Sequence, residues 1–225
     1  MENKKQKKQR NHLYEELTEC SPIGYFIGVI DGDGSASIHY KNKRRYISYI
    51  ITLGAHDKDF IDFFLDCIYK ITKVKPTKRY EERITNFKKS NKQYLSKKWR
   101  VRFNSKALYD LYQNQRLNYI KKYPIQYLQG VFDSEGCVFL NKHKKPRICI
   151  GMHNLEIITH VKNVLFDNNI RSSNIYQRGE CYSLKLSIDG SILFSKKLGL
   201  HIKRKQQRLL GNTNYFPTEV YRDAK

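Results

Sequence analysis

One nine-residue pattern occurs twice in this chain, at residues 26–34 and 128–136, and it constrains the fold more than any other feature. The first copy reads FIGVIDGDG and the second LQGVFDSEG. Each is an apolar stretch with a central Gly, closed by an acid, one residue, an acid and a Gly. One copy alone would be weak evidence for a functional site, because an acid followed by Gly is also an ordinary end of a helix. Two copies predict two similar halves whose final acids, Asp33 and Glu135, come together.

The elements expected in the first half follow from apolar periodicity and turn residues. Ser21 can cap a helix, and Pro22 is tolerated at its first position. Apolar residues recur at helical spacing after residue 57, and in 100–104 the Arg and Asn positions alternate with Val and Phe. The predicted order is a helix over 22–31, a hairpin over 35–52, a helix from 57, a hairpin over 78–103 and a helix over 106–119.

The second half repeats this order after an expected linker near 114–123. Its helix from Asn154 should turn Leu155, Ile158, Val161 and Leu165 inward, because these residues recur at helical spacing. The predicted elements are a helix over 124–135, a hairpin over 137–152, a helix from 154, a hairpin over 174–188 and helices over 191–198 and 203–210.

Charge narrows the class of partner. The chain has 43 Lys and Arg against 21 Asp and Glu, a formal net charge of +22. Such a field favours a polyanion, because each neutralised phosphate releases condensed counterions. Nucleic acid is therefore the expected partner, although a merely solvating lysine excess would give the same composition. No apolar run approaches the roughly 20 residues of a membrane span, and residues 1–20 form an expected basic arm without a signal-peptide core.

The five cysteines predict neither a disulfide framework nor a zinc site. Cys20, Cys67, Cys137, Cys149 and Cys181 are odd in number, far apart and without a CxxC pair. We expect most of them to be small core residues of an intracellular protein.

The glycines inside the two repeated stretches explain how the acids could meet. Gly28 and Gly130 hold equivalent positions, and Gly24 extends the small face of the first copy. Small residues at a helix–helix contact let two backbones approach closely, although this effect is best attested in membranes. If the two helices pack side by side in parallel, Asp33 and Glu135 become neighbours, and a divalent cation would relieve their repulsion.

The two motifs resemble those of the LAGLIDADG homing endonucleases, and the order of elements is similar to that family over residues 21–212. The arrangement looks most like the single-chain, archaeal intron-encoded type. The resemblance implies an α+β fold of two pseudo-symmetric αββαββα repeats, with two antiparallel sheets forming a saddle over DNA. The implied domains are an arm at 1–20, repeats at 21–118 and 119–212, and a tail at 213–225.

The resemblance also implies the activity: Mg²⁺-dependent hydrolysis of both DNA strands at a long asymmetric site, leaving short 3′ overhangs. Two or three Mg²⁺ ions per DNA complex would be held by Asp33 and Glu135, with Gly32 and Ser134 beside them. Metal ions between carboxylates and phosphate activate water and stabilise the leaving oxygen, so no side-chain nucleophile is required.

Basic residues near the site are assigned by the same resemblance. Segment 201–206 resembles the place where family members bring a lysine beside the hydrolytic water, with Lys205 aligning best and Lys203 second. In the first half Lys106 is the corresponding candidate. A solvated basic helix start is the alternative. The family often has Gln after the second strand of each repeat, whereas residues 52–54 and 150–152 read TLG and IGM here.

Residues on one face of the strands are expected to reach the major groove, where base edges carry a readable code. The candidates are Ser35, Ser37, His39, Lys41, Arg45, Arg79, Arg100, Arg102, Lys142, Arg147, Gln177, Lys185 and Ser187.

Two other functions are compatible with the sequence. Relatives with this fold include RNA maturases, for which intron RNA would be the partner, and non-cleaving DNA-binding regulators. Retention of both Asp33 and Glu135 favours cleavage. We expect an intron-encoded monomer without membrane association, in a prokaryotic cytoplasm or in the organelle that houses the intron.

Overall fold

The computed structural model describes residues 17–41, 46–86, 93–141, 143 and 145–211. The expected turn of the first hairpin, most of the basic arm and the tail therefore lie outside the described residues. Contacts divide the chain into two units, residues 1–127 and 128–225. Each unit is described by itself.

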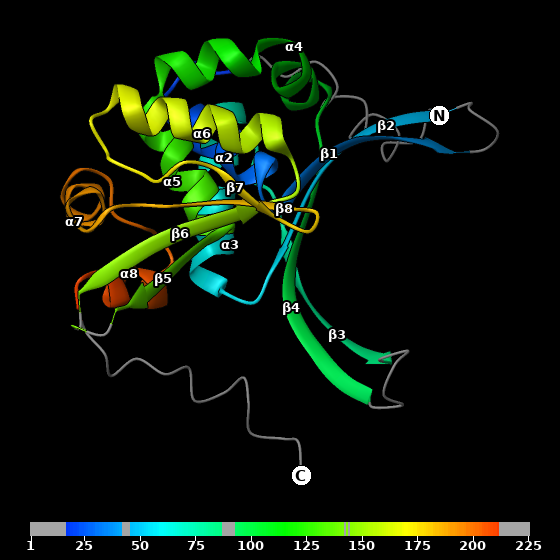
Figure 1. Cartoon of the computed structure of the whole chain (residues 1–225). Helices are drawn as coiled ribbons and strands as arrows, with labels where there is room; N and C mark the ends of the chain where they lie inside the picture. The colour runs from blue at the N-terminus through cyan, green and yellow to red at the C-terminus, as the bar shows by residue number, and fades with distance from the viewer. Residues whose placement is uncertain (1–16, 42–45, 87–92, 142, 144, 212–225) are drawn as a thin grey trace, which may run out of the picture. The chain divides into compact units, whose positions relative to one another are not determined.

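Both units contain a four-stranded antiparallel sheet with the same strand order (Figure 1). The first sheet has the order β1-β2-β4-β3 and the second β5-β6-β8-β7. In the first sheet the strands are β1 (Gly34–Lys41), β2 (Tyr46–Ala55), β3 (Lys78–Asn86) and β4 (Gln93–Asn104). In the second they are β5 (Gly136–Leu140), β6 (Pro146–Met152), β7 (Tyr176–Arg178) and β8 (Cys181–Lys185). The predicted α+β class with two repeats is confirmed.

The helices of the first unit cover one face of its sheet. They are α2 (Pro22–Asp31), α3 (Lys58–Thr72) and α4 (Lys106–Lys122). Every residue of α2 from Ile23 to Asp31 is buried, and this helix contacts α3, α4 and β1. Phe26 stacks on Phe64 of α3 at 6.0 Å between ring centroids. The apolar motif helix is therefore the centre of the first core, which explains its lack of a polar face.

The second unit repeats this packing with a shorter sheet. Its helices are α5 (Pro124–Ser134), whose residues 124–127 belong to the first unit, α6 (Leu155–Asp167), α7 (Ile188–Lys197) and α8 (Lys203–Leu209). Phe132 of the motif helix meets Phe194 of α7 edge to face, with centroids 4.8 Å apart. The N-cap Asn154 accepts hydrogen bonds from the amides of Glu156 and Ile157 at 2.9 and 3.2 Å, so α6 begins where it was expected.

Three expectations about local structure are wrong. Residues 114–122 continue α4 rather than forming a linker, because no Gly or Pro interrupts the helix before Pro124. Leu155 is 48% exposed, since it is the first residue of α6, before the helix settles on the sheet. Among the cysteines only Cys67 is buried; Cys137 is exposed, and Cys20, Cys149 and Cys181 are intermediate.

The closing glycine of each motif is required by a close backbone approach. A Cβ on Gly34 would lie 2.9 Å from Cα of Ile30 and 3.0 Å from O of Val29. A Cβ on Gly136 would lie 2.4 Å from O of Phe132. Each strand therefore starts so tightly over the last turn of its motif helix that no side chain fits.

We expect Gly136→Ala to lower the free energy of unfolding by about 1–3 kcal/mol, the usual effect of overpacking. Gly54→Ala is the matched control, because a Cβ there would meet only Lys98, at an ordinary 3.7 Å. Urea denaturation of both variants checks this. Equal stability of the two variants would show that the strand start can shift without cost.

Candidate metal and DNA-binding site

Asp33 and Glu135 occupy the same place in their units, between the motif helix and the first strand. Asp33 follows Gly32, whose amide donates to O of Gly28 at 3.2 Å, and it is exposed. Glu135 is half-buried, and its amide donates to O of Val131 at 2.9 Å. Each carboxylate thus lies at the C-terminal end of a helix, where the helix dipole favours a cation nearby.

The first acid of each motif has a structural role, which the sequence pattern did not reveal. Asp31 is enclosed, with no exposed side-chain area. Its carboxylate accepts from Tyr112 Oη at 2.9 Å, from Tyr127 Oη at 3.0 Å and from Arg116 through Nε and Nη2, the latter at 2.8 Å. Burial alone would lower the pKa of Arg116, but the hydrogen bond and charge of Asp31 outweigh burial and raise it. Burial and the same charge raise the pKa of Tyr127. Asp31 therefore joins the end of α2 to α4 and to the first turn of α5.

Asp133 is equally buried and organises the start of α8. Its carboxylate accepts from the amides of His201 and Ile202 at 3.1 and 3.2 Å and from Nδ1 of His201 at 3.0 Å. The two copies of the motif thus use their first acid for structure and leave the last acid at the surface. The sequence signal for these two roles is that each motif ends in two acids separated by one residue. Two such acids at a helix end cannot both face the same side.

Lys205 lies at the end of the second motif helix. It is 5% exposed, and its ammonium donates to the carbonyls of Phe132, Asp133 and Ser134 at 3.2, 2.5 and 3.1 Å. Three carbonyls match the three donors of an ammonium. In this arrangement Lys205 neutralises the end of α5 one residue before Glu135, and its action on a water molecule stays a prediction.

The other two lysines are placed differently. Lys203 is exposed on the first turn of α8. Lys106 forms an i,i+4 ion pair with Asp110 on α4, and its Nζ lies 5.6 Å from the ring centroid of Tyr49. Among these three candidates, Lys205 is the one whose ammonium donates hydrogen bonds to carbonyls at the end of a motif helix.

Gly24 makes a close contact of the kind expected for the motif helix. A Cβ there would lie 2.6 Å from O of Tyr123 and 3.1 Å from Cβ of Gln126. The first turn of α2 therefore lies against the start of α5. Gly28 and Gly130 are buried, and their role at a helix interface stays a prediction.

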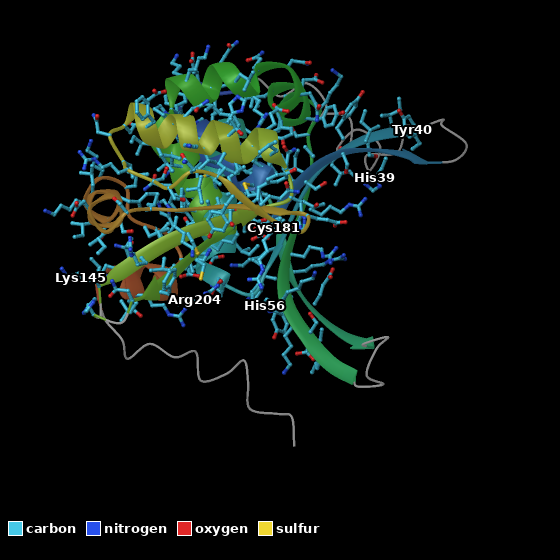
Figure 2. All side chains as sticks on the ribbon, viewed as in Figure 1. His39, Tyr40, His56, Lys145, Cys181 and Arg204 are labelled. Atoms are coloured by element: carbon cyan, nitrogen blue, oxygen red, sulfur yellow. The ribbon has the colours of Figure 1, made fainter. Side chains whose placement is uncertain are left out.

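Strand register places most of the candidate DNA-binding residues of the first sheet on one face. Ser35 is opposite Thr52, Thr52 is opposite Arg102, and Arg79 is opposite Arg100. Because side chains alternate along a strand, Ser37 and His39 share this face as well. The other face carries the buried Ile51, Leu53, Val101 and Phe103. We call the face that carries Ser35, Arg79 and Arg100 the outer face of the first sheet. Figure 2 shows His39 far along the β1–β2 hairpin.

The second sheet brings fewer of the candidates together. Arg147 is opposite Phe139 and shares a face with Cys149, whose partner is Lys185. Gln177 is opposite Tyr182 and therefore lies on the other face from Lys185, contrary to expectation. Ser187 caps α7 by accepting from the amide of Gly190 at 2.8 Å. Arg45, Lys142 and the side chain of Lys41 lie outside the described residues.

The donor set fits a hard divalent cation only in part within either unit. Carboxylate and carbonyl oxygens, as offered by Asp33 with Gly32 and by Glu135 with Ser134, are the ligands that Mg²⁺ and Ca²⁺ prefer. Within the described residues no group of three or more His, Cys, Asp or Glu side chains could hold a metal ion. A cation bound at either acid would therefore need further oxygen ligands. None of the helices described here is both long and apolar enough to cross a membrane.

These features define a two-repeat α+β protein in which a buried motif helix ends in a surface acid. A family model described as a LAGLIDADG-like domain matches residues 122–192. The uncharacterized protein MJ0398 of Methanocaldococcus jannaschii is 30% identical over 214 residues, which cover 86% of this chain and 72% of that protein. The chain belongs to the LAGLIDADG family.

Further comparisons agree on the fold. The uncharacterized protein MJ0314 of the same organism is 32% identical over 133 residues, covering 56% of this chain and 45% of that protein. The structure of I-DmoI in complex with DNA and Mn is 20% identical, covers 79% of this chain and 96% of that one, and has a TM-score of 0.55. For the homing endonuclease I-WcaI bound to its DNA recognition sequence, the identity is 16%, both coverages are 88% and the TM-score is 0.57.

Proposed function

We propose that this protein is a site-specific endonuclease that hydrolyses both strands of a long, asymmetric DNA target with the help of Mg²⁺. The observation that carries the proposal is the repetition of one arrangement in both units. In each unit an acid follows the end of the motif helix, and the strand that starts after it belongs to a four-stranded sheet that carries candidate DNA-binding residues. Two proteins of this fold, I-DmoI and I-WcaI, are described as bound to DNA.

Asp33 and Glu135 would hold the metal together, one acid from each repeat, with Gly32 and Ser134 offering carbonyl oxygens. A bound divalent cation supplies an activated water and neutralises charge at the scissile phosphate. Lys205 would offset the partial negative charge at the end of α5, next to Glu135. I-DmoI structures with DNA and Mn or Ca accord with divalent-metal use.

The outer face of the first sheet and the face of the second sheet that carries Arg147 and Lys185 would bind the duplex. Arginine, serine and histidine side chains can reach base edges in the major groove, while the formal net charge of +22 adds affinity for phosphates. A single chain with two non-identical repeats is suited to an asymmetric site as a monomer. Such an enzyme would be encoded in an intron. It would act in the compartment that holds the intron-bearing DNA.

Selection from a randomised library of long duplexes tests recognition first. The protein is incubated with the library in EDTA, and bound duplexes are recovered, amplified and sequenced over several rounds. We expect one asymmetric site to emerge, with affinity that falls steeply as salt rises. Equal retention of unrelated duplexes would contradict site-specific recognition. Preference for structured intron RNA over duplex DNA in the same format would favour a maturase instead.

A further inference from the structure

A single glutamate, Glu81, lies between two arginines on the outer face of the first sheet. Its Oε1 is 2.7 Å from Nη2 of Arg79, and its Oε2 is 3.0 Å from Nε of Arg100. The side chain of Glu81 is 18% exposed, while Arg79 is 68% and Arg100 30% exposed. The acid is thus mostly covered, and the arginines are the groups that a ligand would meet.

Strand register shows why an acid is needed there. Arg79 of β3 is directly opposite Arg100 of β4, and Glu81 is opposite Lys98. Like charges directly opposite each other across two strands are destabilising. Glu81 reduces this repulsion and gives each arginine one fixed partner, one carboxylate oxygen for each. Without it, two long cationic side chains would move apart and sample many directions.

The nitrogens that Glu81 occupies determine what remains for a ligand. Its contact with Arg100 is made at Nε, which is buried and not aligned for a hydrogen bond. Its contact with Arg79 is made at Nη2, one of the two terminal nitrogens. A guanidinium held in one direction can present two parallel donors, the geometry that matches O6 and N7 of guanine in the major groove.

An acid would be a disadvantage on a surface that only neutralised phosphates. It lowers the local positive charge and repels the DNA backbone, so its presence favours base reading over backbone binding. From this geometry we propose that Glu81 is a positioning residue that directs Arg79 and Arg100 toward guanine bases, so that these three residues form a guanine-specific subsite. The proposal depends on the DNA-binding function proposed above.

The test compares the sequence preferences of four variants with those of the parent protein. Glu81→Gln removes the charge but keeps the shape. Glu82→Gln is the matched control, because Glu82 is the next residue, lies on the other face and has its carboxylate 3.8 Å from Nζ of Lys97. Arg79→Lys and Arg100→Lys identify the base positions that each arginine reads. The readout is selection from the randomised duplex library, followed by affinity for every single-base change in the selected site.

We expect Glu81→Gln to lower the preference for guanine about fivefold or more, at the same positions that the two arginine variants relax. Affinity for unrelated duplexes should rise equally in Glu81→Gln and Glu82→Gln, since both lose one negative charge. Unchanged guanine preference in Glu81→Gln would overturn the proposal, and so would uniform weakening at all positions. If the parent protein selects no duplex at all, the proposed function fails and the subsite with it; a selected site that the arginine variants leave unchanged overturns the subsite alone.

Discussion

Asp33→Asn and Glu135→Gln are each expected to abolish DNA cleavage while leaving binding intact. Each substitution removes one carboxylate charge from the proposed metal site, to which each repeat would contribute one acid, and neither side chain belongs to the buried core. Metal-assisted charge stabilisation contributes several kcal/mol, and each 1.4 kcal/mol is about tenfold in rate, so a loss of roughly a thousandfold or more is expected. Single-turnover cleavage of the selected duplex with Mg²⁺ measures the rate, and gel-shift titration in EDTA measures binding.

Asp167→Asn is the matched control for these variants. Asp167 is an exposed acid at the last position of α6, so its loss changes the charge of the protein by the same amount at a comparable helix end. Its cleavage rate should equal that of the parent protein. A parent-like rate in Asp33→Asn or in Glu135→Gln would show that the acid in question is not a metal ligand.

Asp31→Asn is expected to destabilise the first unit by about 3–5 kcal/mol, because it leaves the half-buried guanidinium of Arg116 without its counter-charge. The two tyrosine hydroxyls that donate to Asp31 would lose a charged acceptor as well. Urea denaturation gives the free energy of unfolding. Loss of cleavage in this variant should follow loss of folded protein, which separates it from Asp33→Asn.

Asp110→Asn serves as the control for this prediction. Asp110 pairs with Lys106 on the same helix that carries Arg116, but the side chains of both Asp110 and Lys106 are 40% exposed, and exposed pairs contribute about 0.5 kcal/mol or less. The double substitution of Asp31 by Leu and Arg116 by Met should regain part of the lost stability, because it removes both charges. A change below about 1 kcal/mol in Asp31→Asn would mean that water reaches Arg116 readily.

The repeated motif was sufficient to predict both motif helices, and apolar periodicity with turn residues predicted the order of helices and hairpins along the chain. The stretch after Ser21 begins with Pro22 and ends at an acid and Gly, and α2 has those bounds. Alternation in 100–104 placed Arg100 and Arg102 on the face opposite Val101 correctly. Such local signals act over neighbouring residues, and the sequence carries them in full.

What the sequence could not supply depended on contacts between distant residues. The partners of Asp31 lie more than 80 positions away, at Arg116 and Tyr127, and no spacing rule connects them. Gln177 was placed on the wrong face because the register of the three-residue strand β7 is set by its pairing with β8, not by its own alternation. Ser187 lies at the end of a strand pattern, but the chain turns into α7 there and uses the hydroxyl as a cap.

Cleavage of the selected target with Mg²⁺ and with EDTA, followed by sequencing of the DNA ends, shows whether this protein is a site-specific endonuclease. A plasmid carrying one copy of the site is incubated with the protein under both conditions. We expect a double-strand break at that site with Mg²⁺, short 3′ overhangs on both sides, and intact plasmid with EDTA. Tight binding without any break in Mg²⁺, Mn²⁺ or Ca²⁺ would contradict it and leave a DNA-binding protein that does not cut.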